Sequence, residues 1–581
     1  MSQKSRVALF SVFDKEKIKT EDFVRPLQEM GWKIIGSKGT VEYLAKFSIQ
    51  AQNIADFVGG DPILEHRVVT LSREIHAGLL AKEIQSQLEE LERLGIQKID
   101  LVFAEFYPLE ETIKKGGTFE QVIESTGIGG PAMSRSGAKG NRIVICDPAD
   151  QLMVINWLKA GEPDREEFIN NLAAKAEMVV AKYCLLSANF RSKGRYAGFI
   201  LELARQLAYA ENKDQDPAYL LSTQSDDPLA MDKFEIKSGN PSYISMADAS
   251  TLIEILALLH QAMVLEYGKA PYIVVAGKHG NPCGAAISFE TPQSAILKAL
   301  LGDPVAVMGG EVVTNFPITD ELGQLLFEVQ PELKSQVDRD NWGLDIILAP
   351  EFSEGSIALL GKRERRRLLS NPAMVNPQLS PAEWMCREVR GGFLKQKAPK
   401  FILTRDNIQE WVGQSLNDKE FASLLVAWAV CWRAASNTVA FAKDGMLIGL
   451  GCGQQDRIAC VRLCLEKARK AGHDTNGAVF ASDGFFPYAK SDPADLSDLE
   501  VIYTTLQAAL KMSDLKLVDE VFAQIRARDK REGTQLLADA GCIGGVVPAD
   551  GKNLEEVKKF FLEHGLRVAF VAPEHRGFSK H

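Results

Sequence analysis

The sequence lacks the cysteine pattern of a metal-stabilised or disulfide-linked protein. None of its nine cysteines forms a Cys-x-x-Cys pair, and Cys460 and Cys464, which share a helical pattern, have no histidine nearby. A structural zinc site is therefore not expected, and unpaired thiols are typical of a reducing cytoplasm. The remaining cysteines are scattered, at positions 146, 184, 283, 386, 431, 452 and 542.

Long hydrophobic runs and an excess of positive charge are also missing. No window reaches 18 uninterrupted apolar residues, and the N-terminus has no apolar signal core. We therefore expect a soluble, cytoplasmic protein without a membrane contact. The net charge of −10 gives no whole-chain attraction for nucleic acid. The strongest basic run, at 362–367, is interpreted as the solvated face of a helix, with a contact for an anionic ligand as the alternative.

The composition, 46% hydrophobic and 25% charged over 581 residues, is that of a globular protein too long for a single core. Residues 1–150 alternate strands with amphipathic helices, which predicts parallel βαβ units with ligands beyond the carboxyl ends of the strands. The expected strands are 6–12, 32–35, 99–104 and 142–146, and the expected helices include 21–30 and 80–94.

A helical stretch follows and is interpreted as a connector over 151–216, with helix to about residue 210. The alternation then resumes in a region punctuated by two Gly/Pro-rich turns, and it predicts two α/β lobes, 217–390 and 391–581. No short-period repeat is present. The expected strands of the lobes are 273–276, 305–313, 345–348, 400–404, 438–443, 447–451, 478–482, 544–547 and 567–571.

The most informative motif is Lys278-His279, which ends an apolar strand and precedes a Gly/Pro-rich turn. A cation and a proton acceptor side by side at a sheet edge suit a reaction in which a weak nucleophile loses a proton while an oxyanion develops. Taken alone, such a dipeptide is more often solvated surface.

Two glycine-rich loops in the first 150 residues are candidates for a phosphate site. Gly36-Ser-Lys-Gly-Thr40 lies between a strand and a helix expected to begin near Val41, and Gly127-Ile-Gly-Gly-Pro131 is followed by two cations. Backbone N–H groups and hydroxyls at a helix N-terminus suit a phosphate. A plain strand–turn–helix link is the alternative for each loop.

Two loops of the second half could border a ligand. Ser436-Asn437 leads into a strand and a Lys443-Asp-Gly hairpin turn, which can equally be only a hairpin. Ala481-Ser-Asp-Gly-Phe-Phe-Pro-Tyr488 ends a strand with three aromatic residues, which are usually core but could stack on a planar heterocycle.

Taken together, these segments resemble the bifunctional purine-biosynthesis family that combines 5-aminoimidazole-4-carboxamide ribonucleotide (AICAR) transformylase with inosinate (IMP) cyclohydrolase. The resemblance is collinear from residue 6 to residue 578. Its segments are Ala8 to Lys15, Gly36 to Thr40, Arg67 to Leu71, Phe106 to Pro108, Ile128 to Gly130, Ala138-Lys139, Lys278 to Gly284, Ala349 to Ser353, Ser436-Asn437, Ala442 to Gly445, Gly453 to Gln455, Arg457 and Ser482 to Pro487.

The resemblance implies an N-terminal methylglyoxal-synthase-like domain and a transformylase of two cytidine-deaminase-like lobes without zinc. It implies N10-formyltetrahydrofolate as co-substrate, a purine-pathway nucleotide as partner, K⁺ as a candidate ion, and a homodimer with sites formed between subunits.

The same resemblance implies the site residues. His279 would be the base, Lys278 would neutralise the oxyanion, and Asn437 would orient the amine and the formyl group. The implied nucleotide and folate contacts are Tyr209, Lys213, Asp248, Asp345, Arg457, Asp483, Phe485, Phe486 and Arg576. The implied N-terminal nucleotide site comprises Ser11, Lys15, Ser37, Gly39, Thr40, Arg67, Thr70, Tyr107, Gly129, Gly130 and Lys139.

The sequence departs from the family pattern at both sites. In the cyclohydrolase motifs Val69 replaces a lysine, Gly127 an aspartate and Glu105 an asparagine, and in the transformylase half Ala208 replaces an arginine. The loss of a cation and a carboxylate predicts that cyclisation to IMP is weak or absent. Three functions stay open: an AICAR transformylase, a formyltransferase for another aminoimidazole-type amine, and a non-catalytic nucleotide-binding or subunit-interaction paralogue.

Overall fold

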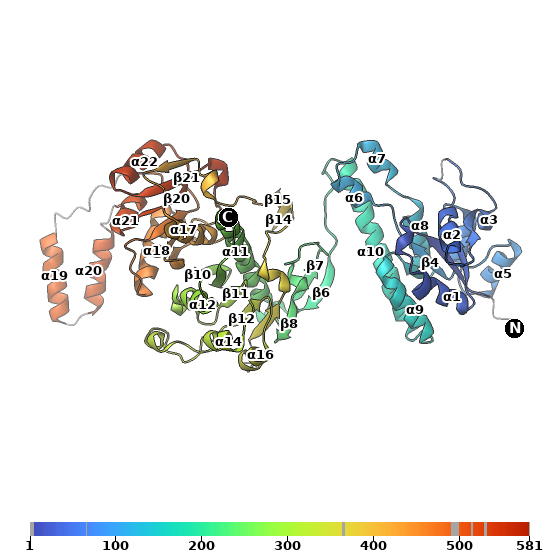
Figure 1. Cartoon of the computed structure of the whole chain (residues 1–581), viewed down its shortest axis with the longest axis horizontal. Coiled ribbons are helices and arrows are strands. Elements are labelled where there is room, and N and C mark those ends of the chain that lie inside the picture. The colour runs from blue at the N-terminus through green and yellow to red at the C-terminus, as the bar shows by residue number, and fades with distance from the viewer. Residues whose placement is uncertain are drawn as a thin grey trace. The chain divides into compact units, whose positions relative to one another are not determined.

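The structure is a computed structural model, and it describes residues 5–64, 67–362, 366–489, 499–512, 515–527 and 531–579. The chain divides into two compact units, Met1–Leu201 and Glu202–His581 (Figure 1). Each unit has its own central sheet and mixes helices with strands, which confirms the predicted α/β class.

The first unit is built on a five-stranded, all-parallel sheet in the order β3-β2-β1-β4-β5, as the alternation of strands and helices predicts. Successive residues of a strand point to opposite faces, so Phe10 and Leu9 enter separate hydrophobic clusters on the two faces. The strands are β1 (Val7–Ser11), β2 (Lys33–Gly36), β3 (Gln52–Asn53), β4 (Leu101–Ala104) and β5 (Ile143–Ile145).

The long helix α10 packs against α8 and β5, so the predicted connector segment belongs to the first unit up to residue 201. Helix α10 ends at Arg191 rather than near residue 210, because Lys193 and Gly194 adopt left-handed backbone that cannot continue it. The helices of this unit are α1 (Arg25–Glu29), α2 (Lys38–Ala45), α3 (Ile54–Val58), α4 (Arg73–Leu80), α5 (Gln85–Arg93), α6 (Leu109–Lys114), α7 (Phe119–Glu124), α8 (Gly129–Lys139), α9 (Gln151–Lys159) and α10 (Arg165–Arg191).

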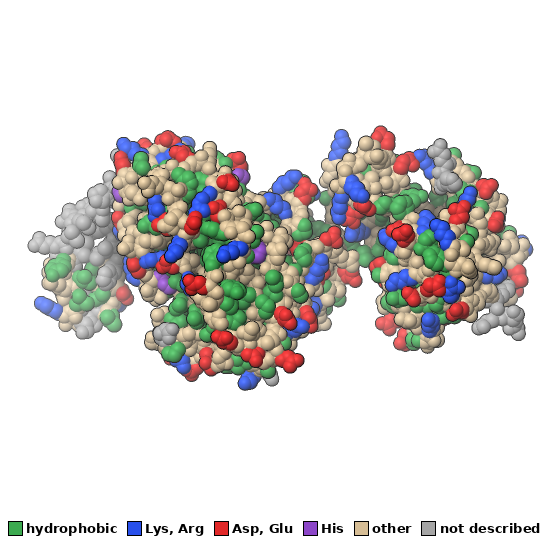
Figure 2. Space-filling view, in the orientation of Figure 1, with side chains coloured by type: hydrophobic (Ala, Val, Ile, Leu, Met, Phe, Trp, Pro, Cys, Tyr) green, Lys and Arg blue, Asp and Glu red, His purple; other side chains and the backbone are tan. Residues whose placement is uncertain are grey.

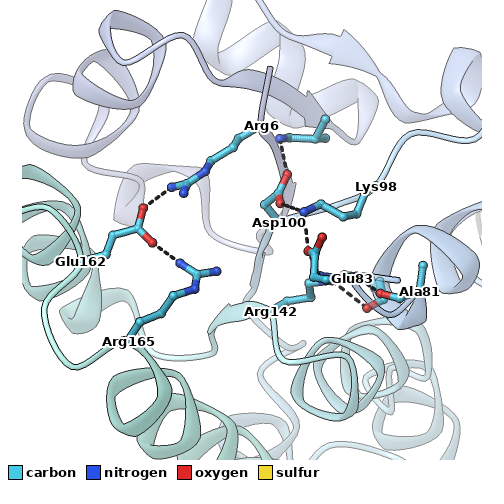
Figure 3. A network of polar contacts seen from close by, with 10 residues as sticks. Arg6, Ala81, Glu83, Lys98, Asp100, Arg142, Glu162 and Arg165 are labelled. Carbon is cyan, nitrogen blue, oxygen red and sulfur yellow. Dashed lines mark hydrogen bonds and ion pairs between the residues drawn. The ribbon is translucent and has the colours of Figure 1, made fainter. Parts of the chain in front are cut away.

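A polar network connects helix α4 and the loop after it to the residues that precede strands β4 and β5 (Figure 3). The buried guanidinium of Arg142 donates to the carbonyl oxygen of Leu79 at 2.9 Å and to Glu83 at 3.1 Å. Lys98 lies 2.6 Å from Glu83 and 2.7 Å from Asp100. The buried cation is thus paired and hydrogen-bonded, as a buried charge requires.

The second unit is built on one twelve-stranded sheet, in the order β16-β21-β20-β19-β17-β18-β10-β9-β11-β12-β13-β8. Two separate hairpins, β6–β7 and β14–β15, complete its strands. The bounds are β6 (Glu202–Gln206), β7 (Tyr219–Ser222), β8 (Glu235–Ser238), β9 (Tyr272–Lys278), β10 (Asn281–Ser288), β11 (Glu311–Thr314), β12 (Ile346–Ala349), β13 (Arg367–Ser370), β14 (Trp384–Val389), β15 (Gly392–Lys397), β16 (Glu410–Val412), β17 (Val439–Lys443), β18 (Met446–Gly451), β19 (Val479–Ser482), β20 (Gly544–Pro548) and β21 (Arg567–Val571).

The two halves of this sheet repeat one topology. In the first half β9 pairs antiparallel with β10 and β11, then β12 and β13 follow parallel and β8 closes the edge antiparallel. In the second half β17, β18, β19, β20, β21 and β16 follow the same pattern. The halves join where β10 pairs with β18. The two lobes predicted from the sequence are therefore halves of one continuous sheet.

Helices α11 and α17 pack against this sheet and against each other, and each precedes the central hairpin of its lobe. Among the described residues α11 is the one helix long and apolar enough to cross a membrane, but 67% of its most apolar window is buried in the protein, as in a core helix. The helices are α11 (Tyr243–Tyr267), α12 (Pro292–Leu301), α13 (Pro304–Val307), α14 (Asp320–Phe327), α15 (Lys334–Val337), α16 (Glu354–Leu360), α17 (Asp418–Cys431), α18 (Arg457–Lys470), α19 (Leu499–Lys511), α20 (Leu515–Ala527), α21 (Gly533–Asp539) and α22 (Leu554–Glu563).

Four sequence predictions in this unit are wrong. The Gly/Pro-rich turn expected after His279 ends at Gly280, and Asn281–Ser288 forms strand β10, paired with β9. The strand expected at 305–313 begins only at Glu311, because Asp303 caps a short helix, α13, that Pro304 starts. Residues 400–404 form no strand. The basic run at 362–367, interpreted as a solvated helix face, ends in strand β13, where Arg367 is buried; 363–365 lie outside the described residues.

Hairpin β14–β15 is exposed along both strands and carries several large apolar side chains. Elsewhere on the visible face, Lys and Arg side chains are interspersed with Asp and Glu rather than gathered into one field (Figure 2). The exposed apolar residues of the hairpin are Trp384, Met385, Val389, Phe393 and Leu394.

Candidate active site

The turn between β9 and β10 carries Lys278 and His279. His279 (φ 52°) and Gly280 (φ 68°) are both left-handed, as in a two-residue hairpin turn. Asp248, on α11, accepts hydrogen bonds from the backbone N–H groups of both residues. The His279 side chain is exposed, and Lys278 Nζ uses one of its three donors on the carbonyl oxygen of Met308 at 2.7 Å. The turn thus carries an exposed imidazole directly after the strand residue whose ammonium is held by the Met308 carbonyl.

A carboxyl cluster lies beside this turn. Glu311 begins β11 and pairs in register with Gly277 of β9, and its side chain contacts Asp248. Asp345 precedes β12, the next strand of the sheet. Burial raises the pKa of Glu311 to about 9, with Asp248 and Asp345 adding to the effect, and burial also raises the pKa of Asp248. Sequence reasoning missed Glu311, although a carboxylate that opens an apolar strand is a signal in itself.

Arg367 holds a second group at the same end of the sheet. Its guanidinium forms an ion pair with Asp345 and donates to the hydroxyl of Tyr209 at 3.0 Å. The structure therefore brings Tyr209 and Asp345 together through an arginine that the sequence analysis assigned to solvent. Lys213, predicted as a substitute cation for the phosphate, lies on an exposed turn, Lys213–Gln215.

In the second lobe Asn437, Arg457 and Asp483 form one connected group. Arg457 begins α18 and pairs with Asp483, which follows β19 and is fully buried. Arg457 also donates to Asn437 Oδ1 at 2.8 Å, and Asn437 Nδ2 donates to the carbonyl oxygen of Gln454 at 3.0 Å. Both ends of the Asn437 amide are thus fixed by the protein, which sets its orientation.

The two groups lie along one edge of the continuous sheet. Lys278 ends β9, Asn281 begins β10, and Asn437 stands just before β17, which runs parallel to β10. The side chain of Asn281 accepts a hydrogen bond from the backbone N–H of Ala435 at 3.1 Å, two residues before Asn437. The turn of the first lobe and the loop of the second are therefore directly joined.

Phe485 and Phe486, predicted as an aromatic wall of the site, lie in different surroundings. Phe485 is partly buried and lies against Gly551. Phe486 is a core residue, packed edge-on against Phe480 and Phe561 in the hydrophobic cluster of the second lobe. Arg576 forms an ion pair with Asp550, beside the same loop.

In the first unit, the loop after β2 gathers several of the predicted nucleotide contacts. Ser37 is the residue before α2, which begins at Lys38 rather than near Val41, and its hydroxyl lies 3.0 Å from that of the buried Thr40. The Lys15 side chain lies next to Gly39. Ser11 ends the neighbouring strand β1. Hydroxyls, an ammonium and a helix N-terminus thus meet at the carboxyl end of the sheet.

The second loop leads into α8. Gly129, the first residue of the helix, lies against the Thr70 hydroxyl, and Gly130 lies against Phe106. Tyr107 packs next to Gly127. Lys139 is at the opposite end of α8, ten residues or about 15 Å along the axis, so the structure does not bring it to this loop. Arg67 is turned to Glu124, with which it forms an exposed ion pair.

The three departures from the cyclohydrolase pattern have structural roles. Val69 packs against the hydrophobic cluster that contains Leu9. Gly127 N–H donates to the hydroxyl of Tyr183 at 2.8 Å. Glu105 accepts from Lys17 at 2.5 Å and from the backbone N–H of Asp14 at 2.7 Å.

Among the described residues no group of three or more His, Cys, Asp or Glu side chains could hold a metal ion.

Comparison with known proteins shows the family to which the chain belongs. The family model for the AICARFT/IMPCHase bienzyme matches residues 138–467, and the model for the MGS-like domain matches residues 19–132. The bifunctional purine biosynthesis protein PurH of Persephonella marina is 31% identical over 498 residues, which cover 84% of this chain and 91% of that protein.

PurH of Caldicellulosiruptor saccharolyticus is 31% identical over 528 residues, covering 89% of this chain and 96% of its own. A crystal structure of ForH is 29% identical and covers 32% of this chain and 99% of that chain, with a TM-score of 0.27. The methylglyoxal-synthase-like domain and the purine-biosynthesis resemblance predicted from the sequence are confirmed. The chain belongs to the AICARFT/IMPCHase bienzyme family and is an enzyme of the formyltransferase type.

Proposed function

We propose that the protein transfers the formyl group of N10-formyltetrahydrofolate to the 5-amino group of AICAR. The observation that carries this proposal is the alignment of the Lys278-His279 turn and the Asn437 group along one sheet edge, joined through Asn281. Transfer of a group between two substrates needs residues that stabilise the developing charge and residues that orient the reactants. The first lobe supplies the former and the second lobe the latter.

In the proposed reaction the amine nitrogen attacks the formyl carbon. The new C–N bond forms, the carbonyl oxygen takes up negative charge, and the bond from that carbon to N10 of the folate then breaks. His279 takes the proton that the amine loses, and N10 receives a proton as tetrahydrofolate leaves. Lys278 stabilises the oxyanion, and the fixed amide of Asn437 orients the reacting groups.

The nucleotide is proposed to lie near Tyr209, Asp345 and Arg367. At Ala208 the family pattern has an arginine, and here the buried cation Arg367 contacts the neighbouring Tyr209. Because Asp345 neutralises part of that charge, a substrate with a different polar group is a second candidate. It would be another aminoimidazole-type amine, recognised by the same residues.

We propose that cyclisation to IMP is weak. Val69 contributes packing where the family pattern has a lysine, and Gly127 offers no carboxylate. Each missing polar group of a catalytic site commonly costs about 10²-fold in rate. The loops at Ser37–Thr40 and Gly129–Gly130 keep donors suited to a phosphate, so nucleotide binding there is proposed to survive.

We propose a cytoplasmic homodimer with a purine nucleotide and a folate as its small-molecule partners, and no nucleic acid or membrane. The exposed apolar side chains of β14–β15 support the dimer, since an apolar two-stranded ribbon is stabilised when another surface covers it. K⁺ remains the proposed ion and zinc is not proposed.

The decisive experiment follows tetrahydrofolate release from N10-formyltetrahydrofolate in the presence of AICAR. Lys278→Ala and His279→Ala are each expected to lower the rate by about 10²-fold or more. The equivalent turn of the second lobe provides matched controls, because Lys443 and Asp444 stand at the same place on β17. Lys443→Ala and Asp444→Ala should retain the rate. No release at high enzyme concentration would refute the proposal, and turnover with another amine would favour the second candidate.

A further inference from the structure

Glu311 and Asp248 are two carboxyl groups that face each other where water is excluded. They are 4% and 5% exposed, respectively, and they contact each other directly. Asp248 Oδ2 and Glu311 Oε2 are both buried without a hydrogen-bond donor from any described residue. Two ionised carboxylates placed in this way would repel each other and leave both oxygens unsatisfied, at a high cost in free energy.

A single proton resolves both problems. If Glu311 carries it, its O–H donates to Asp248, and the remaining charge on Asp248 is stabilised by the backbone N–H groups of His279 and Gly280. The more deeply desolvated partner is the one that keeps the proton, because burial disfavours its charged form.

We propose that Glu311 is a neutral carboxylic acid that donates a hydrogen bond to Asp248, and that this pair fixes the turn presenting His279. Glu311 is a positioning residue: it acts on the turn through Asp248. The turn needs such support because His279 is a non-glycine residue with φ 52°, a conformation that costs about 1 kcal/mol or more. The effect of Glu311 on catalysis rests on the proposed formyl transfer. The proton shared by Glu311 and Asp248 does not depend on that proposal.

The surroundings of Glu311 set the pH dependence. The titratable groups that act on it are Asp248 on α11, Asp345 ahead of β12 and Cys283 on β10. Lys278 and His279 follow Gly277, its partner residue on β9. Lys278 is directed to the Met308 carbonyl, and Asp345 to Arg367. When Glu311 ionises, a second negative charge appears beside Asp248, and the pair that supports the turn is lost.

The first test is independent of catalysis. The folded-state pKa of Glu311 is raised to about 9, so its contribution to stability is fully present at acidic pH and is lost as the pH rises from about 4.5 to 9. The melting temperature of the wild type should fall through this window more steeply than that of Glu311→Gln, whose amide donates to Asp248 without titrating. Glu290→Gln, at an exposed carboxylate, is the control and should follow the wild type. Parallel curves for the wild type and Glu311→Gln would overturn the proposal.

The second test measures formyl transfer against pH. The wild type should lose kcat on the alkaline side with an apparent pKa near 9, and Glu311→Gln should lack this loss while keeping most of the activity at pH 7. Glu311→Ala should lower kcat about tenfold with little change in the KM for folate, since it leaves Asp248 without its donor. An alkaline loss that persists in Glu311→Gln would refute the role. A wild type without any transfer would refute the proposed function, and the melting curves would still decide on the shared proton.

Discussion

Arg457 and Asp483 form an ion pair whose side chains are 8% and 0% exposed, and this pair anchors the loop that carries Asn437. Asp483 also accepts from the backbone N–H of Thr438 at 3.0 Å and from the hydroxyl of Ser436. The carboxylate is therefore fully used inside the protein, and its role is to hold the site in place. The sequence analysis expected it around the substrate itself.

Removal of this carboxylate should destabilise the second unit strongly. Asp483→Asn leaves the Arg457 charge buried with a neutral partner, which typically costs about 3–5 kcal/mol. Urea denaturation followed by tryptophan fluorescence measures the loss. Asp539→Asn breaks the exposed pair with Arg531 and should cost less than about 1 kcal/mol. Equal effects of the two variants would contradict the structural role.

The hydroxyl of Tyr209 should contribute to nucleotide affinity through Arg367. Tyr209→Phe frees one guanidinium donor and removes the constraint on its orientation, so the KM for AICAR should rise by about 2–10-fold with kcat retained. Steady-state kinetics at saturating folate provide the measurement. Tyr219→Phe, at an exposed tyrosine of β7, is the matched control. A fall in kcat at constant KM would place Tyr209 at the reacting atoms instead.

Cyclisation should be slow in the natural sequence and should improve when its missing groups are restored. Val69→Lys combined with Gly127→Asp returns a cation and a carboxylate, and the rate of IMP formation from formyl-AICAR should rise at least about tenfold. The Tyr107 ring must yield by a few tenths of an ångström, since a Cβ at Gly127 would lie 3.0 Å from it. Formyl transfer by the same variant is the internal control, and rapid IMP formation by the unaltered protein would refute the prediction.

The apolar hairpin should hold the proposed dimer together. Leu394→Asp places a charge at a residue of β15 that is 61% exposed, and light scattering after gel filtration should then report the mass of a monomer. Leu562→Asp alters a leucine that is 60% exposed on α22 and should leave the mass unchanged. A dimer that survives Leu394→Asp would place the interface elsewhere.

The elements that the sequence predicts well are those with a strong apolar pattern. Strand β9 and the presence of a tight turn at its end follow directly from an apolar run that stops at Lys-His-Gly. The predictions that are wrong concern residues whose position is decided by contacts with segments distant in the sequence, and not by the local pattern. Arg367 reads as a solvated charge within a basic run, and it is buried because Asp345 and Tyr209 come to it from segments 22 and 158 residues away. Glu311 was overlooked for the same reason, since its partner Asp248 lies on a different element.

The sequence predicts two α/β lobes, but it does not predict that they share one continuous sheet. No alternation of strands and helices indicates that β10 would pair with β18 across the two lobes, because that pairing depends on a single long-range register, Ala286 with Met446. Lys139 shows the converse: its distance from Gly129 follows from the length of one helix, which the sequence analysis did not place.

The bond across that seam, from Ile287 N–H to the carbonyl oxygen of Gly445 at 2.9 Å, has a mechanical consequence. A hinge motion that separated the lobes would have to break the β10–β18 pairing in the middle of the sheet. We therefore expect the two halves of the sheet to move as one rigid body. In the proposed reaction, the spacing between the imidazole of His279 and the anchored amide of Asn437, which belong to different lobes, would then stay constant through the cycle.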